Sequence, residues 1–357
     1  MSFRQAANIS LGAGQGFGLV DIQRLKAMGF DAIRIPAYWG RFQPNNAIDV
    51  DQTPFTTSIG PANTVGLDQY VAWATSENMK VIIPLAWSDS FPPPTWAFAG
   101  LTTLYARTEK LLQTGSHEAD GYINTWRAIA NRYRGKQNVI FEIINEPGIS
   151  DKTSQYPTLY ADLCERIYDA MNCTNLVLVS ILRAGDAWEE VVDEQPQIMR
   201  NVGYSTHRYE PFGDYDPAAQ AYAFDYSTNA YGWVTLDKYI LWRIKRCSDK
   251  IKGWGAKEYN TEFGKSINSL NYAAWLNTVM TINREQGLVG WTVHEYNSEG
   301  GDFSIVNADG TPTPIYDIVK QYMTAAPAMP ADNGKTILLI GAILLAIGII
   351  ISMKEGD

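Results

Sequence analysis

The feature that most constrains the fold is a regular alternation of short β-branched runs with amphipathic stretches between residues 7 and 323. This alternation favours a parallel sheet, because each amphipathic stretch forms a helix that returns the chain to the same end of the sheet. The runs with the length and composition of strands are 7–11, 32–36, 80–85, 139–144, 176–180, 202–207, 257–263 and 288–294. We therefore predict a (β/α)8 TIM barrel over residues 1–323, with its chemistry at the carboxyl ends of the strands.

The stretches between these runs carry apolar residues at helical spacing. Ile22, Leu25 and Met28 share one face, which ends at Gly29, as expected for a helix that stops at a glycine. The same spacing recurs in 122–133 and in 315–322. These patterns predict helices on the outside of the barrel.

The carboxyl end of the chain has a different composition. Residues 336–353 are eighteen consecutive residues without a charge, which as a helix would cover roughly 27 Å of a hydrocarbon core about 30 Å thick. We predict a transmembrane anchor there, although a buried helix of a soluble core is the alternative. Residues 324–335 are predicted to be a linker and 354–357 a short tail. Lys335 and Lys354 flank the span evenly, so the positive-inside rule gives no orientation.

Composition excludes several functions. The net charge is -9 and no cluster of Lys and Arg is present, so we expect no binding to nucleic acid. The three cysteines have no zinc-site spacing, and the chain has no phosphate-binding loop. We therefore expect an activity that requires no cofactor and no metal.

Polar residues are concentrated where predicted strands end, which in a barrel is one common edge. The second strand carries Arg34, and the fourth is followed by Asn145 and Glu146. The sixth ends in His207 and Tyr209, and the seventh ends in Glu262.

Strand alternation indicates which way the two glutamates face. In a regular strand, Glu146 would share a face with residues 142 and 144, and Glu262 would share a face with residues 258 and 260. We expect both carboxylates to point into the barrel. Two such carboxylates, roughly 5 to 5.5 Å apart, are what retaining glycoside hydrolysis requires. The alternative is that each is a surface glutamate at a strand end.

Several separated motifs resemble glycoside hydrolase family 5, the cellulase and mannanase group. They span residues 7 to about 323 and are ANISLG with Asn8, FDAIRIP with Arg34, VIFEIINEP with Asn145 and Glu146, THRYEPF with His207 and Tyr209, and YNTEFGKS with Glu262. The pair formed by NEP and TEFG in this order is the most specific of these matches. The resemblance implies a retaining (β/α)8 hydrolase with Glu146 as acid/base and Glu262 as nucleophile.

The resemblance also implies roles for the other residues. Arg34 and Tyr209 would hydrogen-bond Glu262 and keep it ionised, and His207 would orient the carboxylates. Asn145 would bind the sugar 2-hydroxyl. Two alternatives remain open: Arg34 as an ion-pair partner of Glu142, and His207 as a buried core histidine.

The chain departs from the family pattern at two places. Cellulase relatives end the third strand in a pair of histidines, where this chain has Ala86 and Trp87. They end the eighth strand in a tryptophan below the cleavage subsite, where gapless matching gives His294. Trp291 is three residues from His294, so in a regular strand it faces the other side of the sheet, and we expect it to pack outward. His294 is therefore predicted to bind sugar, unless a register offset buries it and Trp87 forms the platform.

Aromatic residues in the loops after strands are further candidates for sugar binding. We select Trp39 and Trp87, whose flat apolar ring faces suit sugar stacking. The alternative is that these rings fill the outer layer of the barrel.

Taken together, the sequence predicts a membrane-anchored, retaining, endo-type glycoside hydrolase acting on a β-linked glucan or mannan. Its expected partners are that polysaccharide and, through residues 336–353, a lipid bilayer, in a cell or on a virion. The alternative is a non-hydrolytic carbohydrate-binding or attachment protein on a membrane or virion surface. The residues at positions 86 and 294 favour the alternative, whereas the retained glutamates favour the enzyme.

Overall fold

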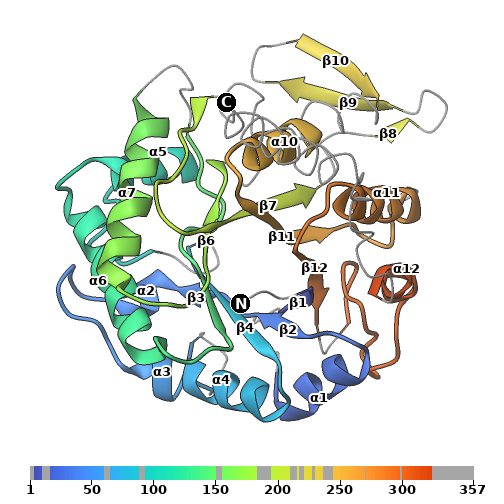
Figure 1. Ribbon diagram of the computed structural model, residues 1–357, viewed down its shortest axis with the longest axis horizontal. Coiled ribbons are helices and arrows are strands. Elements are labelled where there is room, and N and C mark those ends of the chain that lie inside the picture. The colour runs from blue at the N-terminus through green and yellow to red at the C-terminus, as the bar shows by residue number, and fades with distance from the viewer. Residues whose placement is uncertain are drawn as a thin grey trace, which may run out of the picture.

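A closed parallel barrel forms the centre of the computed structural model (Figure 1). The structure describes residues 4–9, 17–59, 65–87, 93–149, 155–182, 194–209, 215–216, 221–226, 230–235, 244–269, 271–297 and 300–323. Around the barrel the strands are β1 (Gln5–Ile9), β2 (Ala32–Arg34), β4 (Lys80–Ala86), β5 (Val139–Glu142), β6 (Val177–Ser180), β7 (Gly203–Tyr209), β11 (Lys257–Gly264) and β12 (Gly290–Tyr296). β12 pairs with β1, which closes the ring, and the short β3 (Ala37–Tyr38) pairs with the end of β4. The predicted barrel is confirmed.

Helices surround the barrel on its outside (Figure 1). They are α1 (Leu19–Ala27), α2 (Trp39–Phe42), α3 (Thr53–Thr56), α4 (Leu67–Ser76), α5 (Leu104–Leu112), α6 (His117–Tyr133), α7 (Tyr156–Met171), α10 (Arg246–Gly253), α11 (Tyr272–Glu285) and α12 (Pro314–Met323). The predicted helical stretches correspond to α1, α6 and α12. A small antiparallel sheet follows β7 and lies outside the ring (Figure 1). It consists of β8 (Tyr215–Asp216), β9 (Ala221–Tyr226) and β10 (Ala230–Thr235), and we did not predict it.

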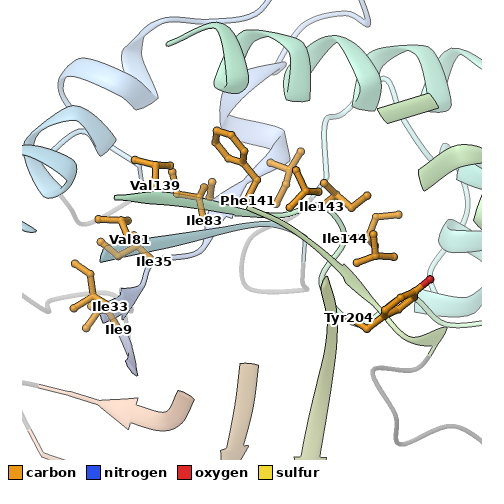
Figure 2. Packing of buried hydrophobic residues seen from close by; sticks show 14 of the residues in the cluster. Ile9, Ile33, Ile35, Val81, Ile83, Val139, Phe141, Ile143, Ile144 and Tyr204 are labelled. Carbon is orange, nitrogen blue, oxygen red and sulfur yellow. The ribbon is translucent and has the colours of Figure 1, made fainter. Parts of the chain in front are cut away.

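The core consists of two apolar layers separated by the sheet. The larger layer fills the space between the strands and the helices, with residues such as Ile33, Ile83 and Phe141 (Figure 2). The smaller layer fills the inside of the barrel and consists of Ala6, Ala32, Ile82, Ile140, Leu178 and Tyr259. Strand alternation explains the split, because successive side chains face opposite sides of a sheet.

The barrel interior becomes polar one step further along the strands. Two residues after the apolar layer, on the same faces of β1, β2, β5 and β6, lie Asn8, Arg34, Glu142 and Ser180. All four are buried. The inward positions therefore place a set of hydrogen-bonding groups directly above an apolar base, at the carboxyl end of the barrel.

The predicted linker, anchor and tail at 324–357 lie outside the described residues. Among the residues that the structure describes, no helix is long and apolar enough to cross a bilayer.

Candidate active site

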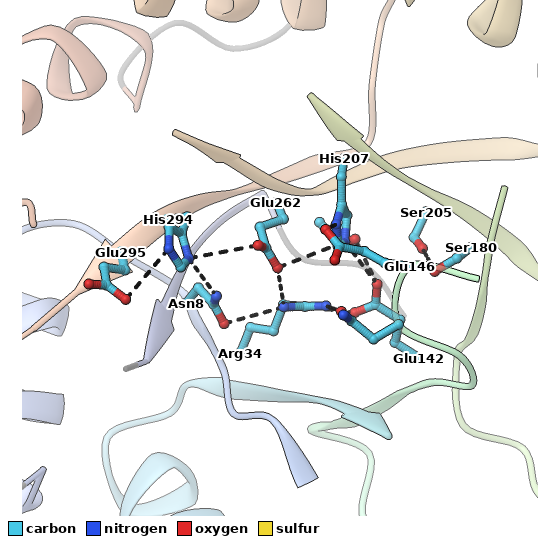
Figure 3. A network of polar contacts seen from close by, with 12 residues as sticks. Asn8, Arg34, Glu142, Glu146, Ser180, Ser205, His207, Glu262, His294 and Glu295 are labelled. Carbon is cyan, nitrogen blue, oxygen red and sulfur yellow. Dashed lines mark hydrogen bonds and ion pairs between the residues drawn. The ribbon is translucent and has the colours of Figure 1, made fainter. Parts of the chain in front are cut away.

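Glu262 lies near the end of β11 and points towards Arg34, inside the barrel (Figure 3). The guanidinium of Arg34 donates to its Oε2 at 2.7 Å, and the hydroxyl of Tyr209 donates to its Oε1 at 2.5 Å. Only 12% of the Glu262 side chain is exposed. A carboxylate held by donors on both oxygens is fixed in orientation and favoured in its charged form.

The reason that Glu262 points inward differs from our expectation. The alternation argument placed Glu258, Asn260 and Glu262 on one face, but Glu258 and Asn260 point outward. Glu258 accepts a bond from Arg208 at 2.7 Å, and Asn260 is bonded to Asn283 of α11 at 3.2 Å. That part of the prediction was wrong.

A β-bulge in β11 accounts for the difference. Asn260 pairs with Thr206 and Glu262 pairs with His207, so Thr261 is an extra residue on the β11 side of the ladder. Such an insertion reverses the facing of the residues that follow it. The Asn260 amide donates to the carbonyl oxygens of Thr206 and Glu262, at 2.8 and 3.0 Å, and so holds the two ends of the bulge together.

Glu146 reaches the same region from a bend after β5. The strand ends at Glu142, so alternation does not continue to Glu146 as we had expected. Glu146 instead has a φ of 47°, in the left-handed region, directly before Pro147. A non-glycine residue in that region costs roughly 1–3 kcal/mol. This turn aims the Glu146 carboxylate at His207, whose Nδ1 lies 2.8 Å from Oε1.

The two carboxylates face each other across a short gap. Ligand atoms of Glu146, His207 and Glu262 all lie within 4.8 Å of one another, so this gap agrees with the separation of roughly 5 Å expected for a retaining pair. These three residues are also the group, among those described, that could hold a metal ion. The positive charge next to Glu262 comes from the Arg34 guanidinium, 2.7 Å from its Oε2.

Arg34 connects both ends of the site. It is buried and donates to Glu142 at 2.7 Å, to Glu262 at 2.7 Å and to the Asn145 Oδ1 at 2.5 Å. Arg34 is thus the ion-pair partner of Glu142 and a donor to Glu262 at the same time, so the two interpretations are compatible. Because Oδ1 of Asn145 accepts from Arg34, its amide nitrogen is the atom left to donate to a further acceptor.

His207 is buried among three carboxylates. Its Nε2 lies 3.7 Å from Glu142 and 3.9 Å from Glu262, while its Nδ1 contacts Glu146. Burial lowers the pKa of His207, but the charge of Glu262 and the nearby carboxylates of Glu142 and Glu146 outweigh it and raise the pKa to about 9. The imidazole is therefore a cation at neutral pH. It is both buried, as the alternative held, and in contact with the carboxylates.

The surroundings favour an ionised Glu262 and a neutral Tyr209. Burial alone raises the pKa of Glu262, but the charges of His207 and Arg34 hold it well below its usual range. Burial and the charge of Glu262 raise the pKa of Tyr209 well above its usual value. Tyr209 therefore remains a hydrogen-bond donor at neutral pH.

His294 lies at the end of β12 beside Glu262, as gapless matching indicated (Figure 3). Its side chain is 28% exposed, and its Nδ1 lies 3.8 Å from Glu262 Oε1. It is not buried by a register offset. Trp291 packs outward against Phe30 and Phe263, with ring centroids 6.4 and 5.9 Å away.

The aromatic candidates have different positions. Trp39 is fully buried and its ring packs against those of Trp87, Trp96 and Tyr122. The prediction that Trp39 stacks on a sugar is therefore wrong, because the apolar cluster around it leaves no ring face exposed. Trp87 is 7% exposed, so it belongs mainly to the same cluster.

Comparison with known proteins identifies the family. The family model described as Cellulase (glycosyl hydrolase family 5) matches residues 19–299. The chain belongs to this family. No curated protein matches the sequence.

Solved structures share the fold at low sequence identity. An endo-β-1,4-glucanase from Xanthomonas axonopodis pv. citri is 16% identical with a TM-score of 0.63, over 90% of this chain and 98% of that one. The cellulose synthase subunit Z of Clostridioides difficile is 17% identical with a TM-score of 0.63, over 90% and 100%. XacCel5A in complex with cellopentaose is also 17% identical with a TM-score of 0.63, over 90% and 99%.

Family membership places this protein among the cellulases of glycosyl hydrolase family 5.

Sequence reasoning missed Glu295 and the roles of Asn8 and Asn260. Glu295 follows His294 directly, and alternation alone would have put it on the opposite face. Asn260 was placed on the wrong face because a bulge leaves no periodic signal. Asn8 was matched only as a motif residue, and its contact with His294 joins residues 286 positions apart.

Proposed function

We propose that this glycoside hydrolase is a retaining endo-type β-glycanase that cleaves a β-linked glucan or mannan by double displacement. Glu262 is the nucleophile and Glu146 is the acid/base. The observation that carries the proposal is the short gap between two carboxylates with different surroundings, one buried among donors and the other 43% exposed. Such a pair suits one permanently ionised group and one group that exchanges protons with solvent.

In the first step, Glu262 attacks the anomeric carbon while Glu146 gives its proton to the departing glycosidic oxygen. The carbon–oxygen bond of the linkage breaks as the bond to Glu262 forms, which leaves a glycosyl ester and a free sugar end. In the second step, Glu146 takes a proton from water, and the resulting hydroxide displaces Glu262. The nucleophile returns to its charged form, and the product keeps its β configuration.

The neighbouring residues support these steps. Arg34 and Tyr209 orient the Glu262 oxygens, and the charge of His207 stabilises the site while Glu146 changes its protonation state. The Asn145 amide nitrogen donates to the sugar 2-hydroxyl, a contact that strengthens in the oxocarbenium-like transition state. Each role needs only donors that the fold already holds in place.

The choice of substrate is supported by the family and its structural neighbours. XacCel5A binds cellopentaose, a β-linked glucose oligomer, and several other neighbours are endo-β-1,4-glucanases. We therefore propose β-glucan as the first substrate to examine and β-mannan as the second. An assay on both polymers that measures new reducing ends and viscosity together separates the two cleavage types. Endo-type cleavage lowers the viscosity strongly for each reducing end formed, whereas exo-type cleavage does not.

Two measurements test the mechanism. Proton NMR of the first product released from cellopentaose should show the β anomer, whereas an initial α anomer would contradict a retaining reaction. A 2-deoxy-2-fluoro cellobioside with a good leaving group should trap the ester, and mass spectrometry should locate the label on Glu262. A label on Glu146 would reverse the two assignments.

We also propose that residues 336–353 attach the enzyme to a bilayer, on the basis of their uncharged composition. A chain ending at Ala331 should leave the membrane fraction and keep the cooperative thermal unfolding of the full chain. If the shortened chain loses that unfolding transition, the segment belongs to the core instead.

A further inference from the structure

Two polar residues near the end of strand β12, His294 and Glu295, lie in sequence beside each other, and His294 faces the proposed nucleophile (Figure 3). The Nε2 of His294 lies 3.6 Å from Oε2 of Glu295, and the two side chains are 28% and 17% exposed. Both side chains are therefore open to solvent, and His294 lies next to Glu262, with its Nδ1 3.8 Å from Oε1.

The protonation of His294 follows from its contact with Asn8. An arginine has only donors, so the atom of Asn8 that lies 3.3 Å from Arg34 is the amide oxygen. The amide nitrogen of Asn8 consequently faces Nδ1 of His294, at 2.9 Å. Because an amide nitrogen only donates, Nδ1 accepts and carries no proton.

A histidine without a proton on Nδ1 carries it on Nε2. The N–H of His294 is thus directed towards the carboxylate of Glu295. Their separation of 3.6 Å exceeds a normal hydrogen bond, so the two atoms do not fully satisfy each other. A hydroxyl group matches this pair, because it can accept from Nε2 and donate to the carboxylate at once.

The surrounding residues hold the imidazole in this position. The rings of Tyr209 and Phe303 pack edge-on against it, with centroids 6.1 and 5.8 Å away. On β11, a Cβ at Gly264 would lie 2.5 Å from the His294 carbonyl oxygen, so only glycine permits this approach. Glu262 is the other charged group near the ring, and a charged His294 would lose the bond from Asn8 in order to pair with it.

We propose that neutral His294 and Glu295 together recognise one hydroxyl group of the sugar at the cleavage position, which makes Glu295 a specificity-determining residue. This inference rests on the proposed function for the placement of the sugar. The 2-hydroxyl belongs to Asn145 there, and O4 belongs to the linkage of the chain. The 3-hydroxyl and the 6-hydroxyl are therefore the candidates.

Nitrogen-15 NMR of the full chain tests the protonation state without any turnover. The chain has three histidines, so selective labelling gives few signals, and a His294→Gln variant assigns the one of interest. At neutral pH, His294 should show an unprotonated Nδ1 and a protonated Nε2, and Asn8→Ala should change this pattern. Two protonated nitrogens on His294 would overturn the inference.

Kinetics with deoxy substrates test the recognition itself. The probes are aryl β-cellobioside and its analogues that lack the 3-hydroxyl or the 6-hydroxyl on the sugar next to the aryl group. Glu295→Gln should lower kcat/KM on the parent probe roughly 10- to 100-fold and on the analogue that lacks the recognised hydroxyl less than about 3-fold. His294→Trp should likewise remove the preference for that hydroxyl.

Glu285→Gln is the matched control, because it removes the same charge from the exposed end of α11 and should leave every probe unaffected. An equal loss on all three probes in Glu295→Gln would overturn the recognition by His294 and Glu295. An α-configured product would contradict the retaining mechanism alone, since the ratio of kcat/KM between probes does not depend on product stereochemistry.

Discussion

The surroundings of Glu262 and of Glu146 differ in almost every respect, although the two carboxylates lie across one gap. The Glu262 side chain is 12% exposed and receives bonds from Arg34 and Tyr209, whereas the Glu146 side chain is 43% exposed and contacts His207. Residues of one chemical type thus acquire different behaviour from burial and donors alone. The environment, rather than the residue type, therefore makes the two carboxylates chemically different.

The two regions also share a feature, because neither carboxylate is presented by a regular strand. Glu262 faces inward because Thr261 is inserted as a bulge, and Glu146 faces inward through a left-handed turn before Pro147. Backbone irregularities of this kind are typical of functional sites. Variants of these residues should therefore separate what burial, donors and backbone each contribute.

The largest effect is expected from removing each carboxylate in turn. Glu262→Ala and Glu146→Ala should each lower kcat on cellopentaose, the former by roughly 10⁴-fold or more. With an activated aryl β-cellobioside, azide should restore turnover of both variants. The Glu262 variant should yield the α-glycosyl azide and the Glu146 variant the β-glycosyl azide, as measured by NMR. The same anomer from both would erase the distinction between the two residues.

Arg34→Met should destabilise the Glu262 region by about 3–5 kcal/mol, because it leaves two buried carboxylates without their cation. The pKa values of Glu142 and Glu262 are lowered on folding, so their contribution to stability is present above about 4.3 and is lost as the pH falls further. Urea unfolding should show this acid dependence in the natural chain and a weaker one in Arg34→Met. An unchanged acid dependence would show that Arg34 does not determine these pKa values.

His207→Gln tests the cation that lies between the two regions. Because folding raises the pKa of His207 to about 9, its stabilising contribution is full below about 6.5 and is lost as the pH rises to about 9. The natural chain should lose roughly 1–3 kcal/mol of unfolding free energy over this range, and His207→Gln should lose less. His117→Gln, at an exposed histidine, should behave like the natural chain.

Asn260→Ala tests whether the bulge orients Glu262. The variant should lower kcat roughly 10- to 100-fold with little change in KM, because it loosens the proposed nucleophile from outside the barrel. Asn175→Ala is the matched control, since Asn175 is also buried and donates to two carbonyl oxygens, at 3.0 and 2.9 Å. Both variants should lose similar stability, and only Asn260→Ala should lose kcat. An equal kcat in the two variants would contradict an orienting role.

The smallest change in stability is expected from Glu146→Gly. Glycine adopts a φ of 47° without the strain that glutamate carries there, so the unfolding free energy should rise by about 0.5–1 kcal/mol while hydrolysis is lost. Thermal unfolding measures the gain. A destabilised variant would show that the bond to His207 contributes more than the turn costs.

The sequence by itself determined the barrel and the location of its chemistry. Alternating runs and helical spacing predicted the eight strands, because periods of 2 and 3.6 follow from backbone geometry alone. The polar residues at the strand ends predicted Glu146, Glu262, Arg34 and His207 as neighbours, since parallel strands in a barrel end at one edge. These features depend on which residues are neighbours along the chain, and that information can be obtained directly from the sequence.

The orientation of those side chains and their contacts depend on the tertiary structure. The bulge at Thr261 reversed the faces of β11, and the packing of three rings around Trp39 removed it from the surface. The protonation of His294 depends on Asn8, which lies at the other end of the chain and meets β12 only when the barrel closes. Ring closure and side-chain packing bring together residues that are far apart along the chain. Contacts of this kind cannot be predicted from the periodicity of the sequence.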